Sequence, residues 1–104
     1  MTTNSPRNPT WRDHLGKHAP DTLESIIELQ ETVTKDGALS LKTKTLMMLL
    51  CDALMAHPDG VTNLARRARA LGANDHEIAE TIAVGFLMGG MPALVTGANA
   101  FKEQ

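Results

Sequence analysis

The chain has 104 residues, a length typical of a single domain. Ten Lys and Arg against 12 Asp and Glu give a net charge of -2, which excludes the broad basic surface of a nucleic-acid-binding protein. The single cysteine, Cys51, cannot form an internal disulfide bond, which fits a reducing compartment. No secretory signal is recognisable, and no apolar run reaches the roughly 18 residues that span a bilayer. We therefore expect a cytoplasmic protein that contacts neither nucleic acid nor a membrane.

The core must be built from small and aliphatic side chains. Hydrophobic residues make up 42% of the chain, whereas aromatic residues make up only 3%. A domain of this size buries a limited share of its surface, so its apolar helices would leave part of their stripes uncovered. A second subunit could cover these stripes, and we therefore expect a homo-oligomer.

The first third of the chain predicts a tail followed by two helical segments. Residues 1–10 are mostly polar and predict a mobile N-terminal tail. The stretch WRDHLGKH predicts a short helix, and apolar residues at helical spacing predict an amphipathic helix over about 22–35. We expect Gly37 to end this helix in the left-handed conformation.

The middle of the chain predicts an apolar central helix that ends near a proline. Ser40 is suited to cap this helix, which begins at Leu41. Its core-facing residues recur every three or four positions: Leu46, Leu49, Leu50, Ala53 and Leu54. His57 precedes Pro58 and is therefore pushed out of the helical region. We expect Gly60 to supply the conformational freedom of the turn.

The last part of the chain predicts three further helices. They cover about 60–71, 75–88 and 92–102, and they are separated by Gly72 and by the Gly89-Gly90 break. No stretch shows the period-two alternation of a β-strand. The chain therefore predicts an all-α domain over residues 11–104, with five main helices and a short N-terminal one.

Three segments in this order carry a resemblance to a known family. They are GALSLKTKTLMMLL, ARRARALGANDHEIAETI and GGMPALVTGANAF, and the upstream WRDHLGKHAPDTLESIIELQETV is similar as well. Together they resemble the carboxymuconolactone decarboxylase family, which includes the alkylhydroperoxidase D-like proteins. The resemblance implies a single-domain helical bundle of the alkylhydroperoxidase D-like type, with about six helices. It also implies that helices pair between subunits to give a trimer or a hexamer.

The chain departs from this family at its reactive residues. The peroxidase branch carries Cys-x-x-Cys-x-x-x-His, and alignment on Ala68 and Gly72 places other residues there: His57, Gly60 and Leu64. A dithiol peroxidase needs an attacking thiolate and a resolving thiol, and this chain has neither in place. The decarboxylase branch resembles the peroxidases in keeping the histidine. The resemblance therefore implies the family fold without the Cys-x-x-Cys-x-x-x-His motif.

Asp52 and His57 are the first catalytic candidates. Histidine titrates near neutrality, and a neighbouring carboxylate would fix the tautomer of its ring, so the two could form a general acid/base pair. They are five residues apart, about 140° around a helix, and would meet only if the helix unwinds before Pro58. Alternatively, Asp52 bonds a neighbouring helix end or an arginine, and His57 only caps the next helix.

Cys51 is the third catalytic candidate, as a peroxide-reactive thiol. A nucleophilic thiol is activated by a helix N-terminus or a cation, whereas Cys51 lies in mid-helix, so we expect it to be a small buried core residue. Cys51 and His57 with several methionines could also form a soft-metal site. Methionine at helical spacing usually fills a core, however, and we expect neither a metal nor a cofactor.

Arg66 and Arg69 are the substrate-binding candidates. They are three residues apart, share a helix face and could clamp a carboxylate or a phosphate. They could equally pair with Glu77 or Glu80 across a subunit contact, and we expect Glu80 to form a buried structural ion pair.

Three functions remain open on the sequence. The first is a family member that binds a small, anionic metabolite and performs proton-transfer chemistry of the lyase or isomerase type, with His57 as acid/base and Asp52 as its orienting partner. The second is peroxiredoxin-type alkylhydroperoxidase activity through Cys51. The third is a non-catalytic oligomeric accessory or binding protein.

Overall fold

Residues 8–102 of the chain are described by a computed structural model, and over this range the chain forms helices and no strand. The helices are α1 (Trp11–His18), α2 (Pro20–Val33), α3 (Leu41–Leu54), α4 (Pro58–Ala70), α5 (Asp75–Gly89), α6 (Met91–Gly97) and a 3-10 helix, η1 (Ala98–Phe101). The all-α class predicted from the sequence is confirmed. Most of the expected tail at positions 1–10 lies outside the described residues. None of the helices over 8–102 is long and apolar enough to cross a bilayer.

The chain divides into two compact units, with the division after Val33. The first described unit contains α1 and α2, and neither helix has a fully buried residue. Its polar contacts include a bond from the Thr10 backbone N–H to the Asp13 carboxylate and one from Arg12 to Gln30 over 3.4 Å, which joins α1 to α2. The single domain expected over residues 11–104 stays a prediction.

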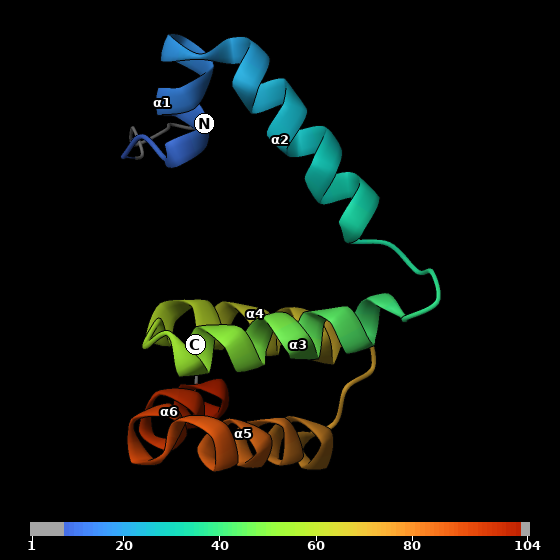
Figure 1. Cartoon of the computed structure of the whole chain (residues 1–104), viewed down its shortest axis with the longest axis vertical. Coiled ribbons are helices and arrows are strands. Elements are labelled where there is room, and N and C mark those ends of the chain that lie inside the picture. Colours follow the sequence, from blue (N-terminus) through green and yellow to red (C-terminus); the bar gives the residue numbers. More distant parts are fainter. Residues whose placement is uncertain (1–7, 103–104) are drawn as a thin grey trace, which may run out of the picture. The chain divides into compact units, whose positions relative to one another are not determined.

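The second unit contains the hydrophobic core. Figure 1 shows α3 beside α4 in one layer and α5 with α6 in another, and α3 contacts all three of the other helices. The core residues are aliphatic and mostly small: Leu49, Ala53, Val61, Leu64, Ala65, Ala68, Ala73, Ile78, Ile82 and Ala100. Small residues also let the layers approach closely, since a Cβ on Gly97 would lie 2.7 Å from Ile82. The core thus has the aliphatic composition that the scarcity of aromatic residues predicts.

Several helix ends differ from the sequence-based expectations. The second helix ends at Val33, and Gly37 is not in the left-handed region, so its predicted role was wrong. Gly72 does adopt positive φ, at 100°, just after α4. The last helix, expected to run unbroken to about residue 102, tightens into η1 at Ala98.

The turn between α3 and α4 is built on Ala56 and not on Gly60. Ala56 has φ of 60°, and it is the one non-glycine residue with positive φ among residues 8–102. Its N–H donates to the Ala53 carbonyl over 3.4 Å, and the His57 N–H donates to the Asp52 carbonyl over 2.9 Å. These two bonds, from the first and second residues after the Met55 C-cap, define a Schellman turn. Pro58 then occupies the favoured first position of α4, and Gly60 lies inside that helix.

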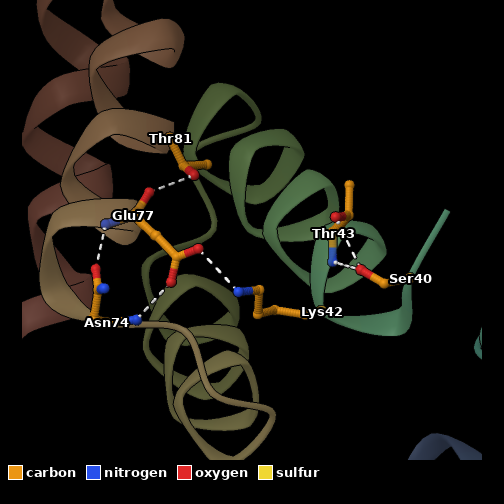
Figure 2. A network of polar contacts seen from close by, with 6 residues as sticks. All are labelled: Ser40, Lys42, Thr43, Asn74, Glu77 and Thr81. Atoms are coloured by element: carbon orange, nitrogen blue, oxygen red, sulfur yellow. Dashed lines mark hydrogen bonds and ion pairs between the residues drawn. The ribbon is translucent and has the colours of Figure 1, made fainter.

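A polar network joins the N-terminal ends of α3 and α5 (Figure 2). The Lys42 ammonium lies 2.9 Å from a Glu77 carboxylate oxygen, and the other oxygen accepts from the Asn74 N–H. The Asn74 side chain in turn accepts from the Glu77 N–H, which completes a capping box at the start of α5. The pKa of Glu77 lies below its ordinary value, chiefly because the Asn74 backbone N–H donates to the carboxylate. The hydrogen bond and the charge of Lys42 lower this pKa further, whereas partial desolvation acts to raise it.

This lowered pKa makes a prediction for the Glu77→Gln substitution. A carboxyl whose pKa is lower in the folded state stabilises the fold above its unfolded pKa, and loses that contribution as the pH falls through the folded value. The variant should therefore be less stable than the wild type at pH 7, and the difference should shrink as the pH falls below the ordinary 4.5. Urea unfolding across this range measures the effect, with Glu28→Gln at an exposed position of α2 as control. Equal stability of Glu77→Gln and wild type at pH 7 would contradict the ion pair.

The left-handed Ala56 predicts that Ala56→Gly stabilises the protein. An L-residue in this conformation costs about 1–2 kcal/mol, and glycine removes that strain at an entropic cost of about 0.5–1 kcal/mol. We expect a net gain of about 0.5–1 kcal/mol in the free energy of unfolding. Ala98→Gly is the matched control, because Ala98 is exposed and right-handed and should lose stability on the same change. A destabilised Ala56→Gly variant would argue against the left-handed turn.

Candidate functional site

The α3–α4 turn brings Asp52 and His57 together. The His57 Nδ1 lies 3.0 Å from the Asp52 Oδ1. Asp52 and His57 occupy the third-last helical position and the second position after the C-cap. In a Schellman turn, the side chains at these two positions frequently form an apolar contact. The helix α3 therefore ends before Pro58, and this allows the two side chains to meet.

The two partners differ in exposure. The Asp52 side chain is 25% exposed, and the His57 side chain is 53% exposed. An ionised carboxylate can only accept hydrogen bonds, so it forms a hydrogen bond with this ring in the tautomer that carries the proton on Nδ1. The Nε2 atom has no protein partner among residues 8–102. The pair thus presents an oriented imidazole whose second nitrogen is open to a ligand.

The other Asp52 oxygen lies over the first turn of α4. A Cβ built on Gly60 would overlap the Asp52 Oδ2 and would lie 2.8 Å from its Cγ. The N-terminus of a helix carries partial positive charge, which makes it a favourable place for a carboxylate. His57 is the N-cap residue of α4 but makes no side-chain cap bond, because its ring faces Asp52. Asp52 is therefore placed by two elements, the His57 ring and the start of α4.

Cys51 lies on a different side of α3 from the core and is exposed, so its expected burial was wrong. The core face of α3 contains Thr45, Leu49 and Ala53, at four-residue spacing. Cys51 belongs instead to a stripe with exposed apolar neighbours: Met47 (49% exposed), Leu54 (42%) and Met55 (62%). The apolar sequence around Cys51 made it look like a core residue, although part of that sequence forms an uncovered surface in the single chain.

The Arg69 guanidinium contacts both η1 and the start of α5. It donates from Nε and Nη2 to the Asp75 carboxylate over 3.2 and 3.0 Å, and from Nη1 to the Ala100 carbonyl over 3.0 Å. The guanidinium also lies 5.7 Å from the centre of the Phe101 ring. These contacts tie α4 to the start of α5 and to η1. They give Arg69 a structural role within the chain.

The other charged candidates are placed less tightly. Arg66 is exposed and is engaged within the protein. Glu80 is exposed in the single chain, and Glu77 pairs with Lys42. The buried pairing of Glu80 with an arginine, expected across a subunit contact, stays a prediction.

Two further residues serve the core. Leu64, where the resemblance places the family histidine, is 9% exposed and packs in the core cluster. Thr45 is fully buried and donates to the Leu41 carbonyl over 2.8 Å. Within the described range, no three His, Cys, Asp or Glu side chains gather as metal ligands would.

Some contacts of the site and its support were missed from the sequence. The start of this helix near residue 75 was predicted, and the capping-box signature Asn74-x-x-Glu77 could in addition have fixed the direction of Glu77. Asp75, the partner of Arg69, is six residues further along the chain. Their contact could be predicted only from the path of the turn between α4 and α5. The role of Ala56 had no signal, because alanine does not favour the left-handed region.

Comparisons with known proteins agree with this architecture. The sequence model of the carboxymuconolactone decarboxylase family matches residues 20–103. A crystal structure of a proposed carboxymuconolactone decarboxylase from Burkholderia xenovorans LB400 is similar with a TM-score of 0.79 and 32% identity, over 89% of this chain and 74% of that one. A crystal structure of a carboxymuconolactone decarboxylase family protein from Legionella pneumophila, in its apo form, is similar with a TM-score of 0.76 and 30% identity, over 84% of this chain and 78% of that one. No curated protein matches the sequence.

The family match covers most of the chain, and both solved structures share its fold. The chain has one cysteine in total, so it lacks the Cys-x-x-Cys-x-x-x-His motif. From these observations, the chain belongs to the carboxymuconolactone decarboxylase family.

Proposed function

We propose that this protein binds a small metabolite beside the α3–α4 turn and transfers a proton to or from it, in a reaction of the lyase or isomerase type. His57 is the acid/base, and Asp52 orients it. The observation that carries the proposal is the 3.0 Å Asp52–His57 contact, at a place where a Schellman turn usually has two apolar side chains. A partly exposed ion pair contributes only about 0–1 kcal/mol to stability, so stability is a weak reason for these two residue types.

The chemistry follows from the arrangement of the ring. With Nδ1–H held by Asp52, Nε2 can take a proton from a carbon next to a carbonyl group, and the carboxylate stabilises the imidazolium that forms. In a decarboxylation, the carbon–carbon bond to the carboxylate breaks, CO2 leaves, and the electron pair left on carbon takes a proton from the imidazolium. Nε2 is the nitrogen that accepts the proton in the first reaction and donates it in the second. His57 would act in place of the histidine that Leu64 replaces.

The proposed metabolite is anionic, as a lactone with a free carboxylate would be. The Burkholderia neighbour is named for a carboxymuconolactone, which belongs to this class. Both arginines considered as anchors have partners within the protein: Arg69 donates to Asp75 and Ala100, and Arg66 is engaged as well. An anion anchored at either arginine would therefore replace one of these partners. We place the protein in the cytoplasm, since a single unpaired cysteine suits a reducing compartment.

The acid/base role predicts a large effect of His57→Gln. We would incubate the protein in D2O with a panel of small lactone and keto carboxylates, including carboxymuconolactone, and follow deuterium uptake and CO2 release by NMR. A positioned acid/base contributes about 10²–10⁴-fold, so His57→Gln should lose that factor on any substrate the wild type turns over. Asp52→Asn should lose less, because Asp52 acts through the ring.

The matched control is His76→Gln, which changes an exposed histidine on α5. It should turn over substrate at the wild-type rate, since His76 is outside the α3–α4 turn. Wild-type turnover by His57→Gln would overturn the proposed mechanism.

We also propose that the protein is a homo-oligomer, a trimer or a hexamer. Support comes from large apolar side chains that the single chain leaves exposed on α5 and α6, at the following positions: Val84, Leu87, Met88, Met91 and Val95. Exposed apolar side chains of this kind, together with the stripe of α3, would be covered at a contact between subunits.

Light scattering coupled to size exclusion tests the assembly. The native mass should be three or six times the 11.2 kDa of the chain. Leu87→Glu, at a side chain 80% exposed in the single chain, should lower that mass while the helix content stays unchanged. A wild-type mass of one chain would contradict the proposal.

A second candidate function is peroxide reduction at Cys51, which the exposure of this residue favours. A thiolate would attack the peroxide oxygen, become a sulfenic acid and release the alcohol. With no second cysteine in the chain, return to the thiol would need an external thiol as reductant. A third candidate is a non-catalytic accessory or binding protein, which would need the assembly but not the imidazole.

A further inference from the structure

We infer that Gly60 is a positioning residue that makes the Asp52–His57 pair possible. The catalytic meaning of this inference rests on the proposed function, whereas the geometry it describes does not. Gly60 touches no reacting atom in the proposal. It acts through the space that its missing side chain leaves for Asp52.

The local backbone does not explain a glycine at this position. Gly60 lies in the first turn of α4, and it is not among the glycines with positive φ, which over the described part of the chain are Gly72 and Gly90. A right-handed helical position accepts alanine and favours it over glycine. The reason for the glycine must therefore be sought in its surroundings.

The nearest part of those surroundings is the Asp52 side chain. A Cβ at Gly60 would overlap the Asp52 Oδ2, and would lie 2.8 Å from Cγ and 3.5 Å from Cβ of the same side chain. Apart from the adjoining residues and the helix's own backbone, the three heavy atoms closest to this position all belong to Asp52. The carboxylate thus occupies the volume that any other residue at position 60 would fill.

The two carboxylate oxygens are coupled through this contact. Oδ1 meets the His57 ring, while Oδ2 rests over Gly60, so a group that pushes Oδ2 away also moves Oδ1. The aspartate side chain is short and can rotate out at little cost to the fold. Gly60→Ala should therefore leave a folded protein in which the carboxylate no longer meets the ring.

The tautomer of the His57 ring reports this change directly. The nitrogen that carries the proton in a neutral imidazole is set by the hydrogen bonds of the ring. We would label the histidines with 15N and record imidazole spectra at about pH 8.5, well above the ordinary histidine pKa near 6.5. His57→Gln identifies the signals of His57 among the four histidines of the chain.

We expect the wild-type ring in the Nδ1–H form and the Gly60→Ala ring mainly in the Nε2–H form, as in Asp52→Asn. Gly37→Ala is the control for a glycine-to-alanine change elsewhere, because its new Cβ would meet only the end of Lys44, 3.9 Å away. It should keep the wild-type tautomer. Circular dichroism and thermal unfolding should show Gly60→Ala to be as helical as the wild type.

Retention of the Nδ1–H tautomer in folded Gly60→Ala would overturn the inference, and so would an Nε2–H tautomer in the wild type. These outcomes are independent of the turnover assay. If Gly60→Ala changes the tautomer while His57→Gln leaves turnover intact, Gly60 positions the pair and the proposed function fails. If the tautomer is unchanged while His57→Gln abolishes turnover, the proposed function stands and the role of Gly60 fails.

Discussion

The Schellman turn after α3 is the constraint on which the candidate site depends. On a continuous helix, Asp52 and His57 would point about 140° apart. The left-handed Ala56 reverses the chain within one residue, so the side chains on either side of it meet at 3.0 Å. Strained backbone of this kind is found at functional sites when the surrounding structure holds it in place. Here the support comes from the two backbone bonds of the turn and from Pro58, which starts α4 immediately afterwards.

The rest of the second unit holds this turn between packed helices. The core of small aliphatic residues fixes α3 against α4, and the helix termini are tied by polar contacts. At the start of α5, Lys42 joins α3 to Glu77. In the same turn of α5, Asp75 pairs with Arg69 of α4, which also donates to the Ala100 carbonyl. Charged residues that could have been substrate contacts are thereby used to hold the helices, while His57 remains more than half exposed.

Much of this fold could be predicted from the sequence, because helical spacing and cap residues are local signals. The helix at WRDHLGKH, the Ser40 cap and the Gly72 stop are all present as expected. The turn residue was not predictable, since alanine gives no sign of positive φ and Gly60 seemed the natural pivot. The exposure of Cys51 was not predictable either, because an apolar stripe that faces a core and one left on the surface have the same sequence pattern. For the site, sequence could nominate Asp52 and His57 but could not bring them together.

Membership in the carboxymuconolactone decarboxylase family establishes the fold of this protein. Because the motif residues are absent, the reaction has to be inferred from other residues of this chain. The proposed function requires an oriented His57 that faces a ligand, and a crystal structure of the assembled protein would decide this. We expect an intact Asp52–His57 pair, with Nε2 lining a cavity large enough for a small carboxylate. A structure in which the pair is broken, or in which a neighbouring subunit seals Nε2 with no cavity beside it, would rule out this function of His57.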